Sequence, residues 1–185
     1  MDISSLMTTL LSDESVQSVG KKTGVSNDMV ESVLENALPM LLKGAKEQAN
    51  GKETAESFAG ALLQHAKTDT SDLGAFMDGV DLEDGAKIIA HLLGAETADK
   101  KKTVAKKAGA TAASTDTILS MAGPLLMSLL GQQAEQEEEK EDVGGLMGSL
   151  LQGVDIGDLA KLLLGKKKEG LGLGDIASLL GKLLK

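Results

Sequence analysis

Cysteine, tryptophan, tyrosine and arginine are all missing from this sequence of 185 residues. Without cysteine there is no disulfide framework, no thiolate nucleophile and no thiolate metal site, which fits a reducing compartment. Without arginine, the chain lacks the planar fork that makes the commonest specific contact to guanine. Phe58 and Phe76 are the only aromatic residues, and because both are placed like core residues, the sequence does not favour base stacking.

Long apolar runs are missing as well. The first residues carry neither a basic region nor the uninterrupted apolar segment of a secretory signal. No stretch reaches the ~18 consecutive apolar residues that a membrane-spanning helix needs. We therefore expect a cytoplasmic protein.

The charge is one-sided, because 19 lysines face 28 acidic residues and leave a formal net charge of -9. A net-negative surface repels phosphate backbones and anionic lipids at long range. Charge therefore disfavours nucleic acid as a partner.

The apolar residues that are present are almost all Leu, Ala, Val, Ile and Met, and they recur at three-four spacing. Leu, Ala and Met favour helices, and runs of β-branched and aromatic residues typical of strands are absent. These patterns predict an all-α, multihelical fold with a core large enough for one main domain.

Short signals mark where the first helices begin and end. Ile3 to Leu11 form an amphipathic stripe, and either Ser12 or Asp13 can cap a second helix that ends at Gly24. Ser26 is a predicted N-cap for a third helix, in which Pro39 predicts a kink or a restart. Further helices are predicted from about 55 to 65, through 86 to 93, and from 97 to 109, followed by a long helix carrying Ile118, Leu119, Ala122, Leu126 and Leu129.

The stretch from Lys67 to Asp84 is acidic and rich in turn residues, and it predicts a loop that includes about one helical turn. It holds Asp69, Asp72, Asp78 and Asp81. These carboxylates could offer oxygen ligands to calcium, but the alternate spacing, central glycine and terminal glutamate of an EF-hand loop are missing. A solvated loop is the better interpretation, and no metal site is predicted.

An internal repeat relates Val19–Leu42 to Val104–Met127 at an offset of 85 residues with eight identities. The identical pairs are Val19 and Val104, Lys21 and Lys106, Lys22 and Lys107, Gly24 and Gly109, Leu34 and Leu119, Ala37 and Ala122, Pro39 and Pro124, and Leu41 and Leu126. The repeat predicts that residues 1–131 form one internally duplicated, pseudo-two-fold domain whose helix-turn-helix-like units span about 13–49 and 97–131.

Beyond this domain the composition changes twice. Residues 132–142 are predicted to be an acidic, solvated linker or a frayed helix extension. Residues 143–185 are Gly/Leu/Lys-rich and are predicted to form an amphipathic helical tail, in which the part from Lys161 to Lys185 carries six lysines against Glu169 and Asp175. Such a tail can lie on an anionic membrane surface, pack on a partner, or fold back on the acidic body or on another copy.

An ordered set of motifs resembles a known family. The set comprises a glycine-hinged helix pair, Ala-Leu-Pro-Met-Leu-Leu at 37–42, Ile-Ile-Ala-His-Leu-Leu-Gly at 88–94, and a second pair ending Ala-Gly-Pro-Leu-Leu at 122–126. Over residues 1–131 the chain is similar to the bacterial domain of unknown function 937, akin to the YidB-like proteins. The resemblance implies a multihelical fold and a bacterial source, and it transfers no catalytic residue.

The glycine-hinged units could read DNA as helix-turn-helix motifs, because a glycine turn between two packed helices is what that motif requires. However, the recognition helix of the first unit would open with Asn27, Asp28 and Glu31. An acidic opening and the lack of arginine favour two ordinary packed helices.

His65 and His91 are the only side chains of the type most often used for general acid/base catalysis. Each is predicted near a helix C-terminus, where a capping or packing role suffices. We therefore expect no catalytic, cofactor-binding or metal-binding residues and no small-molecule substrate. The sequence predicts a non-enzymatic interaction or scaffolding protein that self-associates or binds a protein partner. The alternatives are a nucleic-acid-associated regulator and a peripheral membrane protein that uses the tail.

Overall fold

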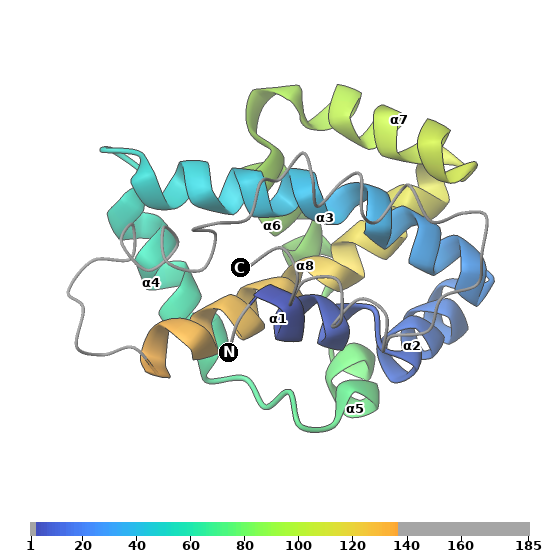
Figure 1. Ribbon diagram of the computed structural model, residues 1–185, viewed down its shortest axis with the longest axis horizontal. Helices are drawn as coiled ribbons and strands as arrows, with labels where there is room; N and C mark the ends of the chain where they lie inside the picture. Colours follow the sequence, from blue (N-terminus) through green and yellow to red (C-terminus); the bar gives the residue numbers. More distant parts are fainter. Residues whose placement is uncertain (1–2, 137–185) are drawn as a thin grey trace, which may run out of the picture.

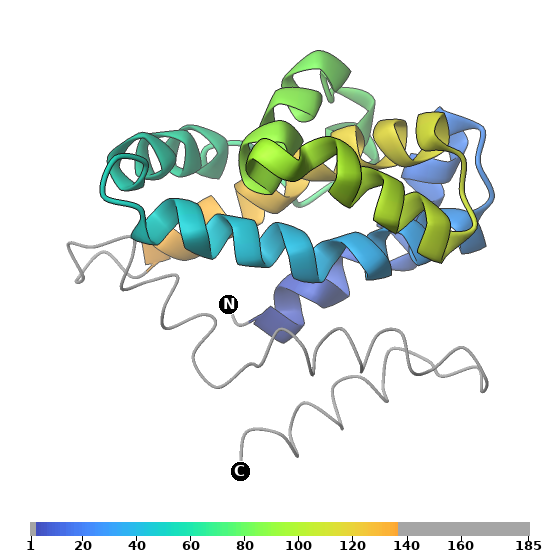
Figure 2. The same cartoon turned by 90° about the horizontal axis from the view of Figure 1, so that it is seen from above.

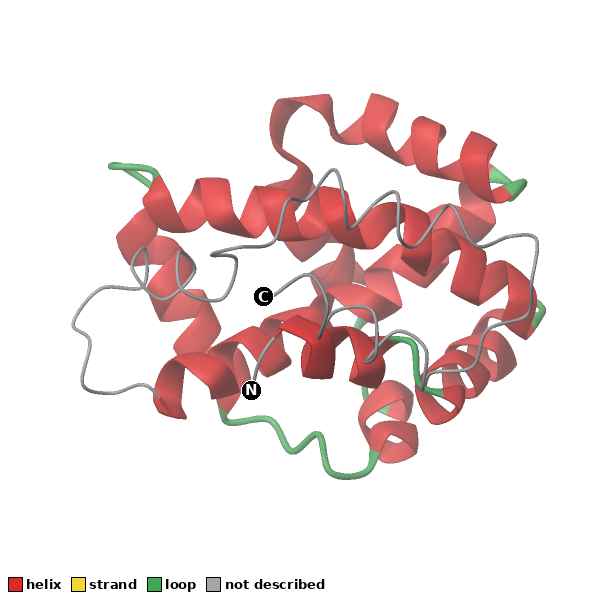
Figure 3. Cartoon of the chain, viewed as in Figure 1, coloured by secondary structure: helices red, strands yellow, loops and turns green. Residues whose placement is uncertain are grey.

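The computed structural model describes residues 3–136, and in that range all regular secondary structure is helical (Figure 3). The all-α prediction is confirmed. The elements are α1 (Ile3–Leu10), α2 (Asp13–Thr23), α3 (Asn27–Asn50), α4 (Ala55–Ala66), α5 (Leu73–Asp78), α6 (Leu82–Leu93), the short 3₁₀ helix η1 (Gly94–Glu96), α7 (Thr97–Ala108) and α8 (Ala112–Gln136). The predicted tail, 143–185, lies outside the described residues.

Helix α8 is the central element of the fold. Every residue from 118 to 131 is buried, and α8 packs against α1, α2, α3, α4, α6 and α7 (Figures 1 and 2). A helix that is apolar all round needs neighbours on every side, which the surrounding helices provide. The core of the described domain is therefore arranged around α8.

The starts of α2 and α3 and the ends of α2 and α7 follow the predicted chemistry. The Ser12 hydroxyl accepts a hydrogen bond from the Ser15 amide (3.2 Å) and caps α2. Gly24 and Gly109 both end their helices at φ 71°, the left-handed geometry that glycine adopts without steric cost. Ser26 stands at the N-cap position of α3 as predicted, with extended backbone geometry, although its side chain accepts no capping hydrogen bond.

The two related segments share local features. In each, a helix ends at a left-handed glycine and is followed by a long helix that contains a proline, first in α2–α3 and again in α7–α8. Both long helices continue through Pro39 and Pro124, so the predicted restart at Pro39 does not occur. A pseudo-two-fold relation between the two units stays a prediction.

The predicted loop 67–84 is more ordered than expected. It contains α5, and α6 begins at Leu82 instead of near residue 86, because Asp81 caps it by accepting hydrogen bonds from the Glu83 and Asp84 amides (2.8 and 3.3 Å). Residues 132–136 belong to α8, which extends to Gln136, in agreement with the predicted helix extension. Residues 137–142 of the predicted linker lie outside the described residues.

Two glycines bring helix backbones into close contact with α8. A Cβ atom on Gly85 would lie 1.8 Å from the Ser120 carbonyl oxygen. A Cβ atom on Gly131 would lie 2.2 Å from the Leu62 carbonyl oxygen. Since Pro124 has no N–H, the Ser120 carbonyl receives no hydrogen bond from the residue four positions on, and it faces Gly85 instead. These contacts determine where α6 and α4 cross α8.

Candidate functional site

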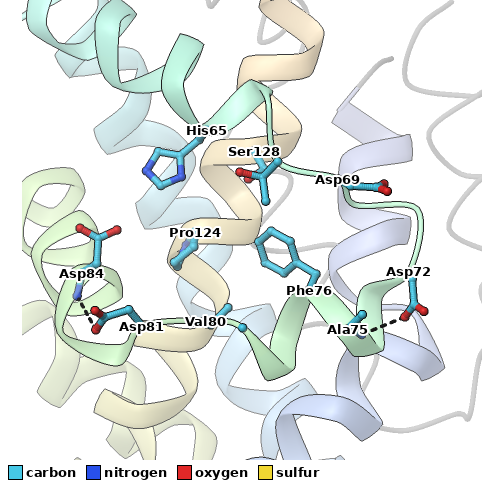
Figure 4. A pocket seen from close by; sticks show the side chains of 12 residues that line it. His65, Asp69, Asp72, Ala75, Phe76, Val80, Asp81, Asp84, Pro124 and Ser128 are labelled. Carbon is cyan, nitrogen blue, oxygen red and sulfur yellow. Dashed lines mark hydrogen bonds between the residues drawn. The ribbon is translucent and has the colours of Figure 1, made fainter.

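A pocket of about 500 Å³ opens where α4, α5 and α6 meet the surface of α8 (Figure 4). Figure 4 shows Asp81 and Asp84 on one side and Asp69 and Asp72 on the other, with Phe76 and Pro124 between them. We call this site the acidic pocket. It is lined by His65, Thr68, Asp69, Asp72, Ala75, Phe76, Gly79, Val80, Asp81, Asp84, Pro124 and Ser128.

The connection between α4 and α5, which forms one wall of the acidic pocket, is held against α8 by Gln132. The Gln132 side chain donates to the Thr68 carbonyl oxygen (2.9 Å), and its Oε1 accepts from the Thr70 hydroxyl (3.1 Å). Each such bond contributes about 1 kcal/mol to stability. One side chain on the central helix therefore positions the wall that carries Asp69.

The opposite end of α5 is held by Lys22 of α2. The Lys22 Nζ donates to the carbonyl oxygens of Met77 and Asp78, both at 2.7 Å. Carbonyl groups at a helix C-terminus carry partial negative charge and lack helical partners, so a cation stabilises them. Lys22 thus ties α5 to the helix pair that the sequence predicted from its glycine hinge.

We expect Lys22→Met to lower the free energy of unfolding by about 1 kcal/mol, the discounted value for a charged hydrogen bond at an exposed site. Urea denaturation followed by far-UV circular dichroism measures the change, and amide hydrogen exchange in α5 shows where it acts. The control is Lys107→Met, 85 residues further on, where the exposed side chain has no hydrogen-bond or ion-pair partner within the described range. Equal effects of the two substitutions would contradict the assigned role of Lys22.

Three of the four aspartates on the rim also have local structural roles. Asp72 and Asp81 accept hydrogen bonds from backbone amides at the starts of α5 and α6. Asp69 accepts from the Ser71 amide (2.9 Å), and hydrogen bonds from the Ser71 side chain and backbone lower the pKa of its carboxyl group. Asp84 lies in the first turn of α6, and its exposed carboxylate has no hydrogen-bond or ion-pair partner among the described residues.

The floor of the acidic pocket is mostly apolar. Phe76 and Val80 are partly buried against the core, while Pro124 and Ser128 belong to α8. Ser128 is fully buried, and its Oγ has no hydrogen-bond partner within residues 3–136. A buried hydroxyl without a partner costs free energy, so Ser128 offers a hydrogen-bonding group to whatever enters the pocket.

The two histidines are in separate places. His65 lies in the last turn of α4 and lines the acidic pocket, and His91 lies exposed in the last turn of α6 outside that lining. Their predicted positions near helix C-termini are confirmed. Across the described residues, no group of three His, Asp or Glu side chains is arranged to hold a metal ion.

The helix-turn-helix-like units do not present two free recognition helices. In the second unit the recognition helix would be α8, whose residues 118–131 are buried in the core. In the first unit it would be α3, which opens with the exposed residues Asn27 and Asp28. A recognition helix must be free to enter the major groove, so these observations do not favour DNA reading.

One described helix is long and apolar enough to cross a membrane by composition alone. This helix is α8 over Ala112–Glu135, and 78% of its apolar window is buried by the rest of the domain. Its apolar residues are interrupted by small and polar ones, so counting uninterrupted apolar runs in the sequence did not detect it. Packing in the core accounts for its hydropathy.

Sequence reasoning did not find the acidic pocket as a site. His65 and the aspartates of 67–84 are visible in the sequence, but nothing in their spacing brings them over Pro124 and Ser128, which are some 40 to 60 residues away along the chain. The excess of carboxylates in a turn-rich stretch was the only available signal.

The described residues therefore define an all-α protein built on a buried central helix, with an acidic pocket beside that helix. The model of the family described as "Bacterial protein of unknown function (DUF937)" matches residues 5–133, and the chain belongs to this family. The resemblance that the sequence motifs indicated is confirmed. Comparison with curated proteins and with solved structures gave no match.

Proposed function

We propose that this chain is a non-enzymatic interaction protein that takes up a basic, apolar protein segment in the acidic pocket. The observation that carries the proposal is the acidic rim over an apolar floor, with Asp69, Asp72, Asp81 and Asp84 around Phe76, Val80 and Pro124. A segment that combines lysine or arginine with leucine-like side chains complements both parts.

Charge supports this choice of ligand. Residues 67–84 carry six carboxylates against the single cation Lys67, so the surface beside α8 is strongly negative. Complementary charge speeds encounter and selects against acidic partners. The local hydrogen bonds of the rim aspartates leave further acceptor sites, because an ionised carboxylate offers about four lone-pair positions.

The floor supports a protein segment as the ligand. Partly buried apolar side chains gain hydrophobic stabilisation when a partner covers them, at roughly 25 cal/mol per Å² of apolar surface. Leu82, 41% exposed, lies immediately after Asp81, and a bound segment could cover it too. The volume of about 500 Å³ lies within the range of ~300–1,000 Å³ typical of binding pockets.

The test is a titration of the isotope-labelled full chain with a synthetic peptide of Lys and Leu at helical spacing, followed by amide chemical shifts. We expect the shifts to be concentrated in residues 65–84 and around Ser128. Asp84→Lys should weaken binding about tenfold, because it removes one attraction and adds one repulsion of about 0.7 kcal/mol each.

The matched control is Asp28→Lys, which reverses an exposed charge in the first turn of α3 instead of α6. It should leave the dissociation constant within about twofold, because Asp28 does not line the acidic pocket. Shifts that fall mainly outside the acidic pocket, or equal weakening by both substitutions, would overturn the proposal.

A further inference from the structure

Two parts of the chain carry opposite charge. Residues 1–136 hold 12 lysines and 19 acidic residues, a net charge of -7, and residues 161–185 hold six lysines and two acidic residues, a net charge of +4. Opposite charges on one chain attract each other, most strongly where either sign is concentrated. On the described domain the negative charge is concentrated at residues 67–84, around the acidic pocket.

The sequence of residues 161–168 has the composition that the acidic pocket requires. It places three consecutive leucines between Lys161 and the run Lys166, Lys167 and Lys168. Leucine side chains match the floor formed by Phe76, Val80 and Pro124, and the lysines match the four rim aspartates. We infer that residues 161–168 of the same chain occupy the acidic pocket, an inference that rests on the proposed function of that pocket.

Ser128 is a second observation that points to a bound group. Its fully buried hydroxyl lines the pocket and has no partner in the part of the chain that the structure describes. A hydroxyl oxygen can accept from a lysine ammonium, and its O–H can donate to a backbone carbonyl. An entering segment of residues 161–168 offers both kinds of group.

Chain length permits this contact within one molecule. Twenty-four residues separate Gln136 from Lys161, and such a segment spans at most about 85 Å. A domain of this size has a radius of gyration of about 14 Å, so the acidic pocket is within reach. A tether of this length gives an effective concentration in the millimolar range, which favours the same chain over a second copy at micromolar protein.

Occupation by residues 161–168 would also regulate access to the acidic pocket. A segment held at millimolar effective concentration competes with any external basic segment. If its intrinsic dissociation constant is about 0.1 mM, external affinity is reduced about tenfold. Removing the lysines of residues 166–168 should therefore make the pocket more accessible to the synthetic Lys/Leu peptide.

The absence of cysteine allows a direct test on the full chain, because Gly165→Cys creates a single attachment point for a nitroxide spin label. We expect the label to broaden amide signals of residues 65–84 at micromolar concentration, unchanged on dilution. A mixture of isotope-labelled chain without nitroxide and unlabelled chain with nitroxide isolates contacts between molecules. Broadening of residues 65–84 in that mixture as strong as in the labelled chain itself would identify a second copy as the occupant and overturn the inference.

Matched substitutions distinguish the proposed segment from the rest of the tail. Replacing Lys166, Lys167 and Lys168 by Gln should abolish the broadening and tighten binding of the external peptide about tenfold. Replacing Lys182 and Lys185 by Gln, the control in the same tail, should change neither. Equal effects of the two sets per lysine removed would show that net charge alone acts, and would overturn the assignment to residues 161–168.

Substitutions in the pocket complete the test. Asp84→Lys should reduce the broadening and Asp28→Lys should not, and combining Asp84→Lys with Lys167→Glu should restore part of it. Ser128→Ala should weaken the broadening without lowering stability, because it removes a hydroxyl that has no partner in the described domain. A Ser128→Ala chain with undiminished broadening would count against the hydroxyl contact and overturn that part of the inference.

The outcomes separate the two proposals. If the external peptide binds in the acidic pocket with the same affinity in all tail variants and the label broadens nothing there, the inference fails and the proposed function stands. If neither the peptide nor the label reaches the acidic pocket, both fail. A membrane surface as the target of the tail would instead appear as lysine-dependent flotation with anionic liposomes and no broadening in residues 65–84, which also overturns the inference.

Discussion

Gly85→Ala is expected to lower the free energy of unfolding by about 2 kcal/mol or more. The new Cβ would lie 1.8 Å from the Ser120 carbonyl oxygen and 2.7 Å from its carbon, so α6 must move away from α8. Overpacking costs about 1–3 kcal/mol. The cost should lie at or above the upper end of this range where the new atom meets rigid backbone. The better helix propensity of alanine offsets about 1 kcal/mol of this cost. Urea denaturation followed by circular dichroism at 222 nm measures the change in a chain without tryptophan.

The matched control is Gly60→Ala in α4. Gly60 is exposed within a helix, and a Cβ there meets no atom within 4 Å among the described residues. The same chemical change should therefore stabilise the protein by about 0.5–1 kcal/mol. If both substitutions shifted the urea midpoint in the same direction, this would contradict the conclusion that Gly85 is needed for the close packing of α6 on α8.

The helices could be predicted from the sequence because their signals are local. Lys21, Lys22 and Gly24 predict a helix end through charge and glycine conformation, and the structure has that end with Gly24 in the left-handed region. The same holds for Gly109. The start of α6 was missed because Asp81 was counted as one of several loop carboxylates, although a side-chain oxygen two residues before an amide is a typical cap.

The arrangement of the helices depends on contacts between distant residues, and these leave no periodic signal. A pattern of apolar residues on α8 predicts a buried face, but burial of every residue from 118 to 131 depends on six other helices closing around it. Nothing in the sequence distinguishes Gly85 and Gly131, which lie in close helix contacts, from an exposed glycine such as Gly60.

The acidic pocket could be predicted only in part. The carboxylates of 67–84 were visible in the sequence, and their exposure agrees with a solvated stretch. Their position over α8 depends on Gln132, which binds Thr68 and Thr70 from more than 60 residues away, and on Lys22, which holds the end of α5. Neither side chain belongs to a sequence motif. These hydrogen bonds between residues far apart in the sequence are therefore evident only in the three-dimensional structure.

Leu62→Ala is expected to destabilise the protein by about 3 kcal/mol. Leu62 is 0% exposed in α4, the helix whose backbone meets α8 at Gly131. Removing three buried heavy atoms from such a site loses transfer free energy and leaves a cavity, at a total cost of about 2–5 kcal/mol. Because α8 is surrounded on all sides, the neighbouring helices cannot easily move in to fill the space.

The next residue supplies the control for this prediction. Leu63 is 48% exposed in the same helix, and Leu63→Ala makes the same chemical change at nearly the same place. It should alter stability by no more than about 0.5 kcal/mol, so the two urea midpoints should differ widely while the slopes of the transitions stay equal. If Leu63→Ala cost as much as Leu62→Ala, then the exposed leucine must be covered by a part of the protein beyond residues 3–136, and the outer face of α4 would be a contact surface.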